Sequence, residues 1–144
     1  SKAVLPQMIA KNTGSVVCIS SLVGKFGTKL RSSYAASKHA LHGYFDSLRL
    51  EIDNPSIHIM LACPGFIKTN VTINALTANG AAQGTMDNAQ ENGMPAEVFA
   101  QKLIKAINNK KDEVYIGGKE VYGVLIKRFF PKLFAKIIKK AKVT

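Results

Sequence analysis

The chain has 144 residues, of which 47% are hydrophobic and 20% are charged. This composition is typical of one globular domain and excludes a disordered chain. No apolar run reaches the roughly 18 residues that a membrane-spanning helix needs. The net charge of +11 is uneven, because residues 101–144 carry 12 basic and 3 acidic side chains, whereas residues 1–100 carry 8 and 6. The basic character therefore belongs to the C-terminal segment.

The first half of the chain alternates between helical and strand-like patterns. Residues 2–11 look like the end of a helix, which Pro6 would kink, and we expect natural sequence upstream of them. Residues 15–21 form an apolar run rich in β-branched side chains, typical of a strand buried on both faces of a parallel sheet. An apolar stripe predicts a long helix over 33–53, and a second buried strand is expected over 57–63.

The second half continues the alternation after a long polar excursion. Residues 66–94 have weak periodicity and are expected to form a loop, with a short helix near 71–76 as an option. A helix should begin at Pro95, a strand should cover 113–116, and a final helical region from about Val121 should break at Pro131. The order β-α-β-α-β predicts an α/β fold with a parallel sheet and covering helices.

The cysteines and histidines do not suggest a metal site. Cys18 and Cys63 each lie in an apolar, strand-like run, which favours two buried free thiols over a disulfide or metal ligands. His39, His42 and His58 lack metal-ligand spacing with cysteines or carboxylates, so a structural role is the simplest interpretation.

One pair of residues could carry proton-transfer chemistry. Tyr34 and Lys38 are four residues apart on the predicted helix, so both side chains can point into one site. A free tyrosine has a pKa of about 10, and a lysine cation held beside it favours the phenolate. Such a pair can act as a general acid and base. The spacing alone is weak, since a surface tyrosine packed beside a lysine stem would look the same.

The neighbouring strand ends strengthen this interpretation. Ser21 ends the strand before the helix, 13 residues before Tyr34, and Pro64 to Thr69 follow the next strand. In parallel α/β sheets, the carboxyl ends of the strands line the ligand crevice. A hydroxyl, a phenol and a distinctive turn are therefore expected along one crevice.

The combined motif resembles the short-chain dehydrogenase/reductase family, nearest to its hydroxysteroid-dehydrogenase-like members. The family's Tyr-x-x-x-Lys matches Tyr34 and Lys38, and its upstream serine matches Ser21, with Ser20 as the neighbouring alternative. The flanking runs SVVCISSLVG and SYAASKHALHGYFDSLRLE also look like the family. Its Pro-Gly-x-Ile/Val-x-Thr segment matches Pro64, Gly65, Ile67 and Thr69.

The resemblance implies a Rossmann-like fold and a mechanism. Tyr34 would exchange the proton on the substrate oxygen, Lys38 would assist it and bind the nicotinamide ribose, and Ser21 would stabilise developing charge. Tyr34, Lys38 and the matched residues Pro64, Gly65, Ile67 and Thr69 would contact the cofactor, with Ile67 and Thr69 holding the carboxamide. The cofactor would be NADP or NAD, with NADP slightly favoured.

The chain departs from the family pattern in its phosphate-binding part. A Gly-rich turn after a first strand is not found, nor are the residue that selects the dinucleotide and the family's helix asparagine. We therefore expect residues 1–126 to be the C-terminal portion of one Rossmann-fold domain, with 66–94 as its substrate loop. This chain alone should bind dinucleotide poorly and should not turn over.

Residues 127–144 read as a basic amphipathic helix with three possible roles. It could dock on the domain or on a second subunit, lie on an anionic membrane surface, or contact nucleic acid, which is the least favoured role. One predicted face is apolar and the other is basic. The apolar face has Leu133, Phe134, Ile137, Ile138 and Ala141, and the basic face has Lys132, Lys136, Lys139, Lys140 and Lys142.

The resemblance implies an oxidoreductase that moves a hydride between NAD(P)(H) and a carbonyl or secondary alcohol. The apolar character near Phe66 and in the C-terminal region favours a lipophilic small molecule as substrate. The rival hypothesis is a truncated or non-catalytic family member that serves as a binding or membrane-associated module. We expect no nucleic-acid partner and a homo-oligomer when the protein is intact. The protein should be cytoplasmic, either free or peripherally attached to a membrane.

Overall fold

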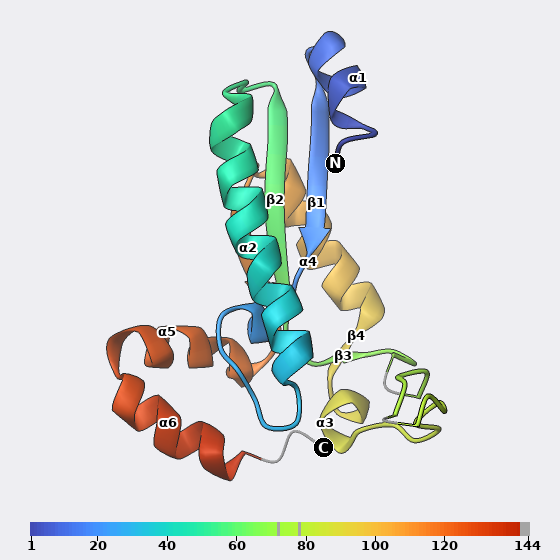
Figure 1. Cartoon of the computed structure of the whole chain (residues 1–144), viewed down its shortest axis with the longest axis vertical. Coiled ribbons are helices and arrows are strands. Elements are labelled where there is room, and N and C mark those ends of the chain that lie inside the picture. Colours follow the sequence, from blue (N-terminus) through green and yellow to red (C-terminus); the bar gives the residue numbers. More distant parts are fainter. Residues whose placement is uncertain (72, 78, 142–144) are drawn as a thin grey trace.

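The computed structural model describes residues 1–71, 73–77 and 79–141. A parallel sheet lies at its centre, with helix α2 on one face and helix α4 on the other (Figure 1). The predicted α/β class, with a parallel sheet and covering helices, is confirmed. The strands, in spatial order, are β1 (Gly14–Ile19), β2 (Ile57–Pro64) and β5 (Glu113–Ile116), and the helices are α2 (Ser32–Ile52) and α4 (Ala96–Asn108).

Strand β2 forms the middle of the sheet and of the core. Met60 to Cys63 are completely inaccessible to solvent, as expected for an unbroken apolar run covered on both faces. On one side Gly14 pairs with Ile57, and on the other side Leu61 pairs with Glu113. Because all three strands run the same way, their carboxyl ends meet at one edge, where the candidate site lies.

Strand β1 is less buried than the sequence predicts. We expected burial on both faces, but β1 pairs only with β2 among the described strands, and Ile19 at its end is 46% exposed. The β-branched run correctly indicated a strand. It could not show that one edge of this strand has no neighbour among the strands that the structure describes.

The first helix, α1 (Leu5–Ala10), is not kinked by Pro6, contrary to expectation. Pro6 lies in the first turn of the helix, where the backbone N–H has no intrahelical partner in any case. The proline is therefore accommodated in the first turn without distorting the helix.

The 66–94 excursion is more ordered than a simple loop. It begins in β3 (Ile67–Lys68) and leads into β4 (Met94–Pro95), which pair in parallel, with the short helix α3 (Asn88–Glu91) before β4. The helix considered near 71–76 does not form in the described residues. The chain makes turns there, and Leu76 bridges antiparallel to Ala82. Gly80, with a positive φ of 81°, permits this reversal.

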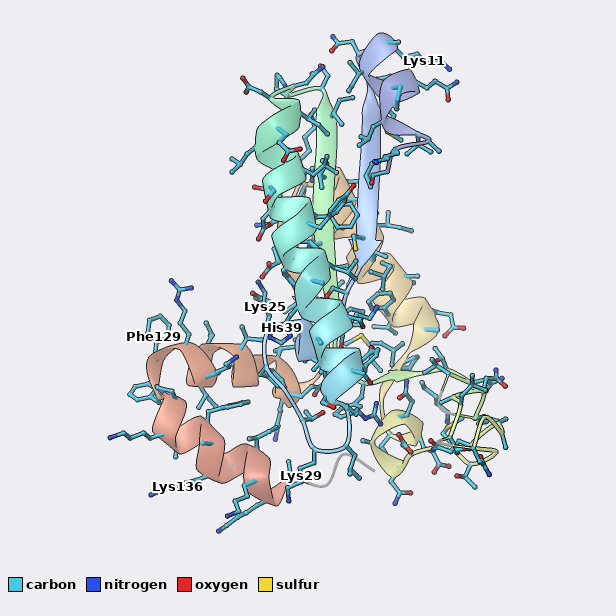
Figure 2. The ribbon with its side chains drawn as sticks, viewed as in Figure 1. Lys11, Lys25, Lys29, His39, Phe129 and Lys136 are labelled. Atoms are coloured by element: carbon cyan, nitrogen blue, oxygen red, sulfur yellow. The ribbon has the colours of Figure 1, made fainter. Side chains whose placement is uncertain are left out.

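The C-terminal region forms a hairpin of two helices, α5 (Tyr122–Phe129) and α6 (Pro131–Lys140). The predicted break at Pro131 is confirmed, because this proline starts α6. The hairpin extends from the carboxyl edge of the sheet, with Phe129 at its corner (Figure 2). The rings of Phe134 and Phe26 pack with their centroids 5.1 Å apart and tie the hairpin to the core. No described helix is long and apolar enough to cross a membrane.

Candidate functional site

Tyr34 and Lys38 lie one turn apart at the start of α2, beside the end of β1. The Lys38 ammonium donates a hydrogen bond to the Ile19 carbonyl, with Nζ 3.0 Å from the oxygen. The same nitrogen lies 5.7 Å from the centroid of the Tyr34 ring, close enough for a cation–π attraction. Tyr34 is 42% exposed, so its phenol can be reached from solvent. The last residue of β1 thus fixes the position of the lysine beside the tyrosine.

The two adjacent serines after β1 have different surroundings. Ser21 precedes the short 3-10 helix η1 (Leu22–Gly24), and its Oγ accepts a hydrogen bond from the Val23 N–H at 3.2 Å. A hydroxyl that accepts a hydrogen bond still has its own hydrogen to donate. Ser20 is 3% exposed, and its Oγ lies 3.1 Å from His42 Nε2. The geometry therefore favours Ser21 over Ser20 as a residue that can meet a ligand.

A large cavity opens beside these groups, with a volume of about 720 Å³, within the range of small-molecule sites. Ser21, Tyr34, Pro64 and Gly65 all line it, so four of the residues singled out from the sequence meet at one cavity. Lys38 stands behind Tyr34 and is not part of the lining. Most of the wall is apolar, and its larger apolar members are Leu22, Val23, Phe26, Leu30, Phe66, Val71, Leu76, Ile126, Phe134, Ile137 and Ile138.

The remaining two predicted residues, Ile67 and Thr69, do not line the cavity. Ile67 is buried in β3, and its carbonyl accepts a hydrogen bond from Gln90 Nε2 at 2.7 Å. Thr69 follows β3 and is exposed. The segment from Pro64 to Thr69 therefore starts at the cavity and runs away from it along β3.

Glu120 holds the turn between β2 and β3, a role that sequence reasoning missed. Its Oε1 accepts hydrogen bonds from the backbone N–H groups of Phe66 at 3.1 Å and Gly118 at 2.9 Å. The carboxylate packs so closely on Gly65 that a Cβ at this position would lie 2.2 Å from Oε1. The only sequence signal was an acidic residue shortly after the Gly117–Gly118 pair, which predicts a turn but not its distant partner.

An ion pair connects the 66–94 excursion to the start of α2. The Asp87 carboxylate lies 2.8 Å from an Arg31 guanidinium nitrogen and accepts a second hydrogen bond from Gln83 Nε2 at 2.9 Å. Asp87 is 9% exposed, and Arg31 lies three residues before Tyr34. The ion pair therefore holds the 66–94 excursion close to the Tyr34 phenol. Two charges 56 positions apart in the sequence gave no signal of this contact.

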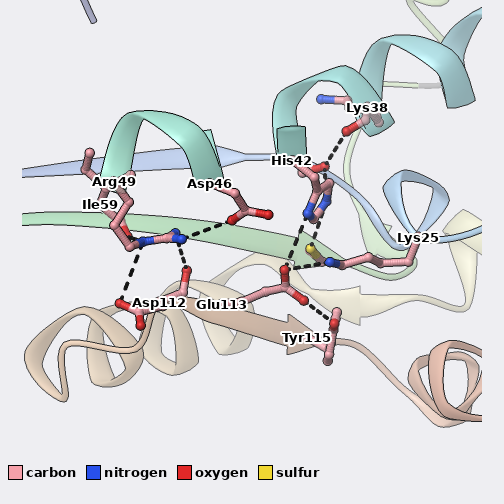
Figure 3. Close-up of polar contacts among 11 residues, drawn as sticks. Lys25, Lys38, His42, Asp46, Arg49, Ile59, Asp112, Glu113 and Tyr115 are labelled. Carbon is pink, nitrogen blue, oxygen red and sulfur yellow. Dashed lines mark hydrogen bonds and ion pairs between the residues drawn. The ribbon is translucent and has the colours of Figure 1, made fainter. Parts of the chain in front are cut away.

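A partly buried polar network lies between α2, β2 and β5 (Figure 3). Glu113 Oε2 lies 2.7 Å from the Lys25 ammonium and 3.4 Å from His42 Nδ1, and the Tyr115 hydroxyl also donates to this carboxylate. Burial, reinforced by the Glu113 charge, raises the pKa of the Cys63 thiol to about 12. Cys63 is therefore a packing residue and not a nucleophile.

The stability of the protein should decrease in mild acid because of His42. Burial first, and then the Lys25 charge, lowers the pKa of this imidazole below the ordinary value of 6.5, although Glu113 opposes the shift. The unfolded chain therefore takes up this proton at a higher pH than the folded chain does. The contribution of His42 to stability is complete above pH 6.5 and is lost as the pH falls toward the lowered pKa.

The test compares urea unfolding of the wild type, His42→Gln and His39→Gln at several pH values. His42→Gln should flatten the slope of unfolding free energy as the pH falls below 6.5. His39→Gln, on the exposed side of the same helix, should keep the wild-type slope. Equal slopes in all three proteins would contradict the assignment to His42.

Comparison with known proteins places the chain in a family. The family model for short chain dehydrogenase matches residues 1–80. The chain is 35% identical to dehydrogenase/reductase SDR family member 7B of Danio rerio, over 96% of this chain and 45% of that relative. The chain thus spans about half the length of the curated relatives that it matches.

Solved structures show the same fold. A short-chain dehydrogenase/reductase from Burkholderia phymatum, in complex with NAD, aligns with a TM-score of 0.74 and 18% identity, covering 92% of this chain and 53% of that one. A short-chain dehydrogenase from Burkholderia cenocepacia, in complex with NADP, has a TM-score of 0.74 and 16% identity, with 97% and 53% coverage. The fold, the matched residues and the curated relatives together show that the chain belongs to the short-chain dehydrogenase/reductase family.

Proposed function

We propose that the complete protein is a nicotinamide-dependent oxidoreductase that interconverts a carbonyl and a secondary alcohol. The observation that carries this proposal is the meeting of Ser21 and Tyr34 at one cavity, with Lys38 anchored behind the phenol. The family relationship and the NAD and NADP complexes of two proteins with the same fold support it. The proposed cofactor is NADP or NAD.

The residues present fit the nicotinamide end of such a cofactor. Tyr34 and Lys38 offer a hydroxyl and an ammonium at the carboxyl edge of the sheet, where open α/β sheets bind ligands. The Ile19 carbonyl uses one of the three N–H donors of Lys38, which leaves donors for a ribose hydroxyl. Hydride donation or acceptance is the chemistry that the dinucleotide supplies when bound.

The side chains of this chain would handle the substrate oxygen. In the reducing direction, the Ser21 hydroxyl donates a hydrogen bond to the carbonyl oxygen and stabilises the charge that develops there. Tyr34 transfers its phenolic proton to that oxygen as the carbon is reduced. The Lys38 ammonium favours the phenolate that remains. In the oxidising direction, the same phenolate accepts the proton of the alcohol.

The cavity favours a lipophilic substrate. Its wall includes Phe26, Phe66 and Phe134, and Ser21 and Tyr34 are among its polar members. Burying apolar substrate surface against these rings contributes binding energy roughly in proportion to the area removed from water. The carbonyl would then be the one polar group that must meet Ser21 and Tyr34.

The experiment that tests the proposal follows a labelled hydride. The complete protein is incubated with NADPH or NADH that carries deuterium at both C4 positions of the dihydronicotinamide, together with a panel of lipophilic ketones, and the alcohols are analysed by mass spectrometry. We expect deuterium at the carbinol carbon. The 144-residue chain assayed alone should show weak dinucleotide binding and no turnover. Absence of label with every ketone and both dinucleotides would contradict the proposed function. Steady turnover by the 144-residue chain would instead contradict its predicted inactivity.

A further inference from the structure

The α5–α6 hairpin exposes an apolar stripe on its first helix. Tyr122, Leu125 and Phe129 are three and four residues apart, so they lie on one face of α5. Their exposed fractions are 61%, 51% and 65%, so more than half of each side chain faces solvent. Gly123 on another side of α5 packs against the rings of Phe26 and Phe134. The stripe is therefore not the face by which the helix joins the core.

Helix α6 continues this pattern next to a row of lysines. Phe134 is buried against the core and Ile138 packs there too, whereas Leu133 is 50% exposed and Ile137, at the rim of the cavity, is 46% exposed. At 100° per residue, Leu133 and Ile137 lie between the buried residues and the lysines. Phe130, at the corner between the helices, is 63% exposed. The lysines that follow around the helix are Lys132, Lys136, Lys139 and Lys140.

The charge of the hairpin restricts the kind of partner that can cover it. Residues 127–140 contain six basic side chains and no acidic one. A second copy of this chain would bring like charges together, and a nucleic acid would leave the leucine, isoleucine and phenylalanine side chains without an apolar partner. A bilayer that contains anionic lipids offers both complements, because acyl chains accept the apolar side chains and phosphates accept the lysines.

We infer that the α5–α6 hairpin docks on the surface of an anionic lipid bilayer. The corner residues Phe129 and Phe130 enter the interface, and the α6 lysines extend along the apolar surface to the headgroups. Figure 2 shows Phe129 at the end of the hairpin and Lys136 directed away from the domain. Residues 142–144, the end of the predicted basic helix, lie outside the described residues, and the docking does not require them.

The experiment measures vesicle binding by the complete protein. Vesicles of phosphatidylcholine alone are compared with vesicles that contain about one third phosphatidylserine, at low and high salt, by co-sedimentation. The wild type should bind the anionic vesicles and release them at high salt. Phe129→Ser with Phe130→Ser should weaken binding about tenfold, because two exposed aromatic rings are removed from the interface. Lys132→Glu with Lys136→Glu should weaken it more than about tenfold.

Matched variants on the other exposed surfaces serve as controls. Leu50→Ser with Ile104→Ser removes two exposed apolar side chains on α2 and α4, and Lys102→Glu with Lys105→Glu makes the same charge change on α4. Both controls should bind vesicles like the wild type. The inference is overturned if the controls lose as much affinity as the hairpin variants, or if anionic lipid makes no difference. It is also overturned if the hairpin variants change only the oligomeric state measured by light scattering.

Discussion

Replacement of Tyr34 by phenylalanine should lower kcat/KM of the complete protein by about 10²- to 10⁴-fold, because it removes the group that we propose transfers the proton. The ring remains, so its contact with the Lys38 ammonium survives. Since Tyr34 is 42% exposed, losing its hydroxyl should change the unfolding free energy little. The measurement is steady-state kinetics at saturating cofactor, together with thermal unfolding of the same preparation.

Tyr44→Phe provides the matched control for this substitution. Tyr44 lies on the same helix and is 48% exposed, but its hydroxyl meets Ser1 Oγ at 2.7 Å, away from the cavity. This variant should keep wild-type turnover. Near-normal activity of Tyr34→Phe would contradict the proposed mechanism. A similar loss of activity in Tyr34→Phe and Tyr44→Phe would indicate a general effect of replacing tyrosine by phenylalanine.

Gly65→Ala should destabilise the protein by about 2 kcal/mol, because the new methyl group and the Glu120 carboxylate cannot both remain in place. The added Cβ would lie 2.2 Å from Glu120 Oε1 and 2.9 Å from its Cδ and Cγ. Glu120 must then turn away, and the N–H groups of Phe66 and Gly118 lose their acceptor. Because Gly65 and Phe66 line the cavity, activity should fall as well.

A double-mutant cycle with Glu120→Ala separates this contact from a general effect of the added methyl group. Once Glu120 has been shortened, Gly65→Ala should cost at least about 1 kcal/mol less than it does in the wild type. Gly43→Ala on α2 is the control, since a Cβ there meets nothing within 4 Å and alanine favours a helix. Urea unfolding with comparable m values gives all the free energies. An equal cost of Gly65→Ala in both backgrounds would show that Glu120 is not what excludes the methyl group.

The order of the major elements could be predicted because their signals are local. The apolar runs at 15–21 and 57–63 and the helical stripe between them correspond to β1, β2 and α2 with shifts of at most a few residues. Pro131 also marked the boundary between α5 and α6 correctly. Each of these elements is determined by its own side-chain pattern, which one sequence displays directly.

The features that complete the site could not be predicted because they depend on residues far apart in the chain. Strands β3 and β4 are two residues long each, and only their pairing distinguishes them from a loop. The Arg31–Asp87 ion pair and the contact of Glu120 with the β2–β3 turn also join separate segments. The prediction that Pro6 kinks the first helix was wrong for a related reason. The effect of a proline depends on whether the helix has already begun before it.

The open edge of β1 has a practical consequence for work with the 144-residue chain. Backbone groups along that edge have no strand beside them among the described residues, and Val16, Val17 and Cys18 are only partly buried there. Such an edge can recruit a strand from another molecule, particularly in concentrated solution. Preparations of the isolated chain should therefore be kept dilute and checked for β-rich aggregates before a missing activity is attributed to its chemistry.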